Sequence, residues 1–190
     1  MKTQEEKDLL LSELKAHQVA DEFVRGTWLA PDGVKGCFYG CTMKTDSEPR
    51  EKFSEKYDID LWYCYLTEKI FENLPVDQFK SFPYESIEII PLNFDFNLIK
   101  SEWNKRTLLK QLDWVNDESV RTVLIEVSKL FDVNFNEINE SAARSAAWLA
   151  AGSARSAARS AGSAGSAARS AASHYFWMRN TLFELIKKHS

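Results

Sequence analysis

Two cysteines, each preceded by a glycine, form the part of this sequence whose residue types could carry chemistry. They lie in the segment Gly36-Cys37-Phe38-Tyr39-Gly40-Cys41, and a helical pattern upstream of it holds His17 and Asp21. His17 and Asp21 are four residues apart, so a helix places both on one face. An aspartate that orients a histidine, which activates a thiol, is an arrangement found in hydrolases and transferases. Cys37 or Cys41 would be the nucleophile.

The same residues also have a structural interpretation. Cysteine is among the most buried residue types and packs as a small hydrophobic side chain. A structural zinc site needs four ligands, and the Cys-x3-Cys spacing supplies two of them without an evident second pair. We therefore predict no metal and no cofactor, and the sequence favours a non-enzymatic protein over a thiol enzyme.

A second group of residues could bind an anionic, nucleotide-like small molecule. Arg155, Arg159 and Arg169 carry guanidinium groups that bind phosphate in a forked geometry. Gly36 and Gly40 would let a ligand approach the backbone closely, and Trp28 would offer an aromatic surface. The alternative is that the arginines are solvated or form ion pairs with acidic side chains, and we favour this alternative.

The arginines belong to a repeat that spans residues 140–173 and reads ESAARSAAWLAAGSARSAARSAGSAGSAARSAAS. Its variable residues recur with a mean spacing close to the 3.6 residues of a helical turn, so they share one face of a predicted helix. Serine and alanine occupy most other positions, and their small side chains allow a neighbouring helix to pack closely. We expect the helix to continue into an amphipathic tail, unless it breaks at Gly152, Gly162 or Gly165.

Charge is distributed unevenly along the chain. The full sequence has a net charge of −4. The residues from 140 onward carry seven basic and two acidic side chains, a net +5, so residues 1–139 carry −9. A basic helix after an acidic body could bind nucleic acid, but four arginines in the repeat fit docking onto an acidic protein surface better. The partner would be this chain itself, as a homo-oligomer, or another protein.

The rest of the sequence predicts helices. Apolar spacing and capping residues indicate helices over 4–24, 49–57, 61–74, 77–90, 96–114 and 117–131, the first ended by Gly26 and the fourth interrupted by Pro83. The exception is the stretch 27–42, where a Pro31-Asp32-Gly33 turn between aromatic and β-branched residues indicates a short β-hairpin or an ordered loop. No apolar run is long enough to span a membrane. Three cysteines, an odd and sparse set, fit a reducing cytoplasm.

Four segments in this order carry a resemblance. HQVADEFVRGTW, GCFYGCT, LTEKIFENLP and the Ser-Ala-Ala-x tract resemble a family of small uncharacterised bacterial and phage proteins with a Gly-Cys-x-x-Gly-Cys segment and a C-terminal Ser/Ala/Arg-rich repeat. The repeat here has more glycine and less tryptophan than that family's pattern. The resemblance implies no activity, but it favours a site shared by His17, Asp21, Cys37 and Cys41.

The sequence thus predicts an all-α protein. A compact, acidic, multi-helix body would span residues 1–134, and a long Ser/Ala-rich helix with an amphipathic tail would span 135–190. The leading hypothesis for function is a non-enzymatic binding or assembly module that self-associates through the Ser/Ala helix. A protein that binds or sequesters an anionic small molecule is the first alternative, and a thiol-dependent enzyme is the second.

Overall fold

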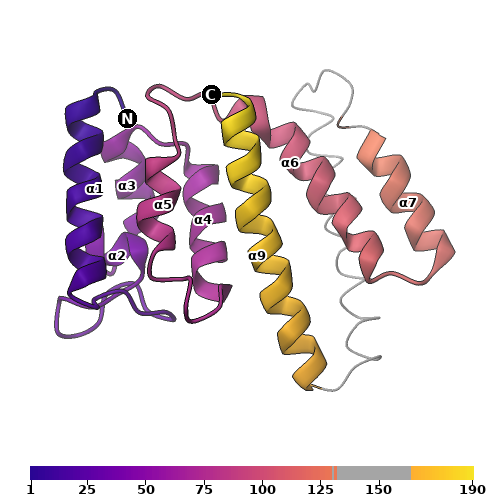
Figure 1. Cartoon of the computed structure of the whole chain (residues 1–190), viewed down its shortest axis with the longest axis horizontal. Helices are drawn as coiled ribbons and strands as arrows, with labels where there is room; N and C mark the ends of the chain where they lie inside the picture. The colour runs from indigo at the N-terminus through magenta and orange to yellow at the C-terminus, as the bar shows by residue number, and fades with distance from the viewer. Residues whose placement is uncertain (130, 132–163) are drawn as a thin grey trace. The chain divides into compact units, whose positions relative to one another are not determined.

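The computed structural model describes residues 1–129, 131 and 164–190, and these residues contain eight α-helices and no β-sheet (Figure 1). The predicted all-α class is therefore confirmed. The described residues fall into two compact units. Unit 1 comprises Met1–Phe96 and Ala171–Ser190, and unit 2 comprises the described part of Asn97–Ser170. The boundary predicted at residue 134 lies outside the described residues and stays a prediction.

Unit 1 contains α1 (Gln4–Val19), α2 (Phe38–Met43), α3 (Pro49–Tyr57), α4 (Leu61–Asn73), α5 (Phe82–Glu88) and the larger part of α9 (Ala164–Lys188). In this unit α1 packs on α5, and α4 contacts both α3 and α5 (Figure 1). Buried aromatic rings hold the helices together. The Tyr63 hydroxyl of α4 donates a hydrogen bond of 2.6 Å to the Ser86 carbonyl of α5, so the α4–α5 contact satisfies a buried polar group.

Several helices of unit 1 begin where the sequence places a capping side chain. The Thr3 hydroxyl accepts a hydrogen bond from the Glu6 N–H at the start of α1. The Asp60 carboxylate accepts one from the Trp62 N–H at 2.8 Å, and α4 starts at the next residue. A side-chain oxygen at this position satisfies an N–H group that has no partner within the helix. These starts agree with the sequence prediction.

Two helices of unit 1 are shorter than predicted. The first ends at Val19 instead of continuing to residue 24, because Asp21 takes a left-handed conformation with a φ of 57°. The helix predicted over 77–90 is limited to α5, which has Pro83 in its first turn. Proline fits the first turn of a helix but disrupts its interior, so α5 begins at Phe82, one residue before Pro83.

The predicted β-hairpin does not form. Within residues 27–42 the Pro31-Asp32-Gly33 turn is present, and the Asp32 carboxylate accepts a 2.9 Å hydrogen bond from the Val34 N–H. Instead of two paired strands there are two isolated bridges, both made by Gly36. The chain enters α2 two residues later, so no length remains for a second strand. The alternative of an ordered loop is the correct one.

The C-terminal helix α9 completes the core of unit 1. Leu182, Leu185 and Ile186 are buried, and the Phe183 ring stacks on Phe82 of α5 with 6.0 Å between centroids. Arg179 forms an ion pair with Glu85 of α5. The repeat contributes its last ten residues, 164–173, to the described helix, including Gly165. Gly152 and Gly162 lie outside the described residues.

Unit 2 contains α6 (Asn97–Lys110), a 3-10 turn η1 (Gln111–Asp113) and α7 (Glu118–Lys129). Asp117 caps α7 by accepting hydrogen bonds from the N–H groups of Ser119 and Val120. The small core of unit 2 is formed by Leu108, Val115, Leu124 and Phe131. No helix in the described part of either unit has the length and apolar character that crossing a membrane requires.

Candidate functional site

The Gly-Cys segment lies in the interior of unit 1 and forms the start of α2. The Cys37 sulfur accepts a hydrogen bond from the Gly40 N–H at 3.5 Å, so this cysteine acts as the cap of the helix. Phe38 and Tyr39 are completely buried, and their rings stack with centroids 4.2 Å apart. The side chains of the segment therefore serve the core and the helix start.

Both glycines of the segment pack against the backbone of Trp28. A Cβ atom on Gly40 would lie 1.6 Å from the Trp28 carbonyl oxygen, and one on Gly36 would lie 2.1 Å from it. The same oxygen accepts a hydrogen bond from the Cys37 N–H at 3.0 Å. The close backbone approach that the glycines permit is thus made by the chain's own residue 28.

Burial controls the chemistry of the cysteines. Loss of water raises the pKa of the Cys37 thiol to about 11 and that of Cys41 to about 12. The Cys41 thiol donates to the Val34 carbonyl oxygen at 3.4 Å. A nucleophilic cysteine needs a lowered pKa, because the thiolate is the reactive form. The environment here acts in the opposite direction on both sulfurs.

His17 and Asp21 have separate partners. His17 Nδ1 forms a hydrogen bond with the Glu22 carboxylate, and its Nε2 lies 3.7 Å from a Glu13 oxygen. Asp21 instead pairs with Lys80, and the hydrogen bond from that ammonium lowers the pKa of the carboxyl group. The carboxylate that orients His17 is therefore that of Glu22, five residues away.

A group of partly exposed side chains lies beside the Gly-Cys segment, and we call it the Trp28 face. It consists of Trp28, Arg50, Glu51, Tyr65 and Glu68. The Arg50 guanidinium contacts two aromatic rings, at 5.4 Å from the Trp28 centroid and 4.2 Å from that of Tyr65. Trp28 is 38% exposed and Tyr65 is 45% exposed, so one cation and two rings form a stack at the surface.

Two carboxylates hold the stack in place. Glu68 accepts a 2.6 Å hydrogen bond from Arg50 Nη1, and Glu51 accepts one of 2.6 Å from the Tyr65 hydroxyl. Burial raises the pKa of Glu68, although the charge of Arg50 and hydrogen bonds from Arg50 and Trp28 act against that shift. One arginine and two glutamates give the face a net charge of −1.

Trp28, Gly36 and Gly40 were predicted as residues of a ligand site, and the structure brings these three together. Arg50, Tyr65 and Glu68 were not predicted to share a surface with Trp28. A signal existed: Leu61, Tyr65, Glu68 and Glu72 are spaced by four, three and four residues, which places them on one face of α4. The apolar residues of the buried face of α4 dominate its hydrophobic pattern, so the exposed face is harder to recognise in the sequence.

The predicted role of the repeat's arginines falls on side chains that the structure does not describe, so it stays a prediction. Arg155 and Arg159 lie outside the described residues. Arg169 is part of helix α9, but the structure does not describe its side chain. Among the residues with described side chains, no group of three or more histidine, cysteine or acidic side chains is arranged to hold a metal ion.

No family model, curated protein or solved structure matches this chain.

Proposed function

We propose that this protein is a non-enzymatic binding or assembly module, with the Trp28 face as its binding surface. The observation that carries the proposal is the exposed stack of Trp28, Arg50 and Tyr65. Tryptophan, tyrosine and arginine are the residue types most enriched where binding energy is concentrated in protein interfaces. Here they are held in a fixed arrangement by Glu51 and Glu68, so binding would order few additional side chains.

The partner we propose is a second copy of the chain, bound through the Ser/Ala-rich helix. The helix sequence carries a net positive charge and the rest of the chain a net negative one, as the composition shows. The net charge of −1 on the Trp28 face suits a partner with arginine side chains, which can also stack on exposed rings. The last ten residues of the repeat lie on α9, which is consistent with a helical partner segment.

The proposal is tested by light scattering on the full chain during size-exclusion chromatography. We expect the chain to be oligomeric at tens of micromolar, and Trp28→Ala combined with Tyr65→Ala to shift it toward the monomer. Replacing Arg155, Arg159 and Arg169 with glutamate should have the same effect. Val76→Ala is the matched control, since Val76 is 69% exposed and lies outside the Trp28 face. A wild-type chain that is a compact monomer contradicts the proposal.

The full chain is required for this test. A chain ending at residue 139 would lack α9, whose Leu182, Leu185 and Ile186 are buried in unit 1. Removing that many core side chains would destabilise the unit, so loss of association would not report on the repeat alone. Substitution of Trp28 and Tyr65, which are 38% and 45% exposed, avoids this difficulty.

A further inference from the structure

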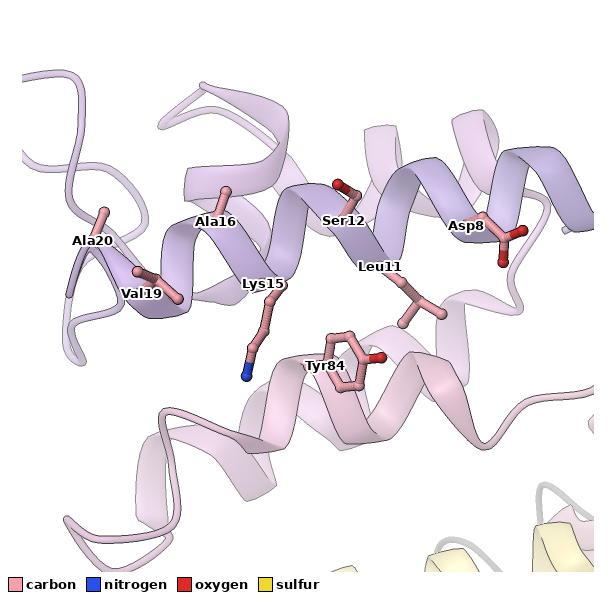
Figure 2. A pocket seen from close by; sticks show the side chains of 8 residues that line it. All are labelled: Asp8, Leu11, Ser12, Lys15, Ala16, Val19, Ala20 and Tyr84. Carbon is pink, nitrogen blue, oxygen red and sulfur yellow. The ribbon is translucent and has the colours of Figure 1, made fainter.

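One face of helix α1 is not covered by any of the residues that the structure describes. It buries Leu10 and Leu14 against the core of unit 1. On another side, an open groove of about 690 Å³ runs along α1 beside Tyr84 of α5 (Figure 2). The groove is mainly apolar: Leu11 points toward Tyr84, and Val19 is 77% exposed. Apolar side chains exposed together along one helix are typical of a surface that another element covers.

Small side chains on α1 allow another helix to approach. Ser12, Ala16 and Ala20 follow one another at intervals of four residues along the groove. Leu11, Lys15 and Val19 form a parallel row at the same interval. Two helices pack when such a row on one lies in the groove beside a row on the other. α1 carries both features, so a copy of α1 is geometrically complementary to it.

Charge fixes the orientation of that copy. Asp8 and Lys15 are both exposed, carry opposite charges and are seven residues apart, which places them two turns apart on the same side of α1. In an antiparallel pair of α1 helices related by a two-fold axis, each Asp8 lies opposite Lys15 of the second copy. The same register places Leu11 opposite Ser12 of the second copy. A parallel pair would instead bring like charges together.

We propose that the α1 groove is an interface for α1 of a second copy, in an antiparallel, two-fold symmetric pair. Symmetric pairs of this kind are the commonest form of homo-oligomer, because one self-complementary surface serves both subunits. The interface uses none of the residues of the Trp28 face or the repeat, so it is separate from the proposed function. Where both interfaces form, the chain assembles beyond a dimer.

The test is a charge exchange in the Trp28→Ala/Tyr65→Ala background, where only association through α1 remains, followed by sedimentation equilibrium of the full chain. Asp8→Lys or Lys15→Asp alone places like charges opposite each other at both ends of the interface, and each should weaken dimerisation about tenfold. The double variant Asp8→Lys/Lys15→Asp should recover it. An equimolar mixture of the two single variants should also dimerise, since one is positive at both positions and the other is negative at both.

The control for Asp8→Lys is Asp77→Lys, which makes the same change in net charge at an exposed position outside the groove. Circular dichroism checks that every variant is folded. Three outcomes overturn the inference: a Trp28→Ala/Tyr65→Ala chain that stays monomeric up to about 200 µM, single charge variants that dimerise as that chain does, or a mixture that associates no better than its components. Association that is lost in the Trp28 and Tyr65 variants but unaffected by charge reversal on α1 overturns this inference and leaves the proposed function standing.

Discussion

The Gly-Cys segment and the Trp28 face are neighbours in unit 1. Residue type suggests a functional site in both, but only the Trp28 face is accessible to a partner. The Gly-Cys segment has two thiols and two glycines, and all of its residues are buried and pack within the core. The Trp28 face combines one arginine, two glutamates and two aromatic rings, and the rings are exposed. The comparison teaches that reactive groups indicate chemistry only where the environment leaves them accessible and favours the reactive form.

The largest effect should come from filling the space between Gly40 and Trp28. Gly40→Ala places a methyl group 1.6 Å from the Trp28 carbonyl oxygen, which is far inside van der Waals contact and meets backbone that cannot easily move. We expect the free energy of unfolding to fall by about 3 kcal/mol. Urea denaturation followed by circular dichroism measures the loss.

Gly26→Ala is the matched control for that substitution. Gly26 has a φ of 81° but no atom within 4 Å of the position of an added Cβ. Its substitution should cost only the conformational strain, about 1 kcal/mol. Equal losses at the two positions would show that the Trp28 carbonyl does not constrain Gly40, and the segment would regain its interpretation as a loop open to a ligand.

The next effect concerns the reactivity of the thiols. With pKa values of about 11 and 12, Cys37 and Cys41 remain protonated at pH 8 in the folded protein. We expect a disulfide reagent such as DTNB to modify the native chain at least about 100-fold more slowly than the urea-unfolded chain. A cysteine that reacts at the unfolded rate in the native protein would restore the thiol-enzyme hypothesis.

The same shifts predict how stability depends on alkaline pH. The folded-state pKa of each thiol lies above its unfolded value near 9. The stabilisation is therefore complete below pH 9 and is lost as the pH rises from 9 toward 11 and 12. The free energy of unfolding, measured from pH 8 to pH 10, should decline, and Cys41→Ala should flatten the decline. A pH-independent value over that range would mean that the sulfurs are more hydrated than the structure shows.

A smaller effect should follow from removing the cation of the Trp28 face. Arg50→Met keeps a long side chain but leaves Glu68, which is partly buried, without its ion pair. We expect a loss of about 1–2 kcal/mol at pH 7. The raised pKa of Glu68 gives the sign of the pH dependence: the carboxyl group takes up a proton as the pH falls, so the penalty should shrink toward pH 4.

The double variant Arg50→Met/Glu68→Gln separates charge from packing. If the unpaired carboxylate causes the loss, the glutamine should recover part of it at pH 7 and abolish its pH dependence. If the double variant is as unstable as Arg50→Met at every pH, contacts between the guanidinium and the rings stabilise the fold, and the ion pair with Glu68 does not.

Much of the fold follows from local sequence signals. Thr3, Asp60 and Asp117 each start a helix near the predicted position, because a side-chain acceptor there is an intrinsic property of a few neighbouring residues. Two errors in helix bounds have local causes, the left-handed Asp21 and Pro83, whereas the predicted hairpin fails because of a contact between separate segments. The stretch 27–42 has the composition of a hairpin, but the Trp28 carbonyl packs on Gly36 and Gly40 and so commits the chain to α2. The spacing of residues in the sequence does not predict that contact.

Of the residues of the Trp28 face, only Trp28 was among those predicted to bind a ligand. Gly36 and Gly40, predicted with it, are buried against its backbone. Arg50 comes from α3 and Tyr65 from α4, and only tertiary packing brings them to Trp28. The partner of His17 was missed because the first helix ends at Val19, so the chain turns and Glu22, not Asp21, approaches the ring. An error of a few residues in a helix end thus changed the predicted site.

The smallest effect on stability is expected from substitutions of Tyr65, which belongs to the Trp28 face and not to the buried Gly-Cys segment. Tyr65→Phe removes the hydroxyl that donates to Glu51 but keeps the ring against Arg50. That hydrogen bond is the main reason why the pKa of Glu51 is lowered, so the pKa should rise toward its ordinary value, as an NMR titration of the carboxyl group would show. Because Tyr65 is 45% exposed and water can replace its hydroxyl at Glu51, the urea midpoint should change little.

Tyr65→Ala removes the ring as well, at a position that is 45% exposed, so its effect on the fold should also be small. Its effect on self-association should be large, whereas Tyr65→Phe should associate as the wild type does, because the ring and not the hydroxyl provides the binding surface. A residue of the Gly-Cys segment would show the opposite pattern, with a large loss of stability. If Tyr65→Ala and Tyr65→Phe associate equally well, the ring is not a binding determinant, and the Trp28 face loses its distinction from any other exposed aromatic surface.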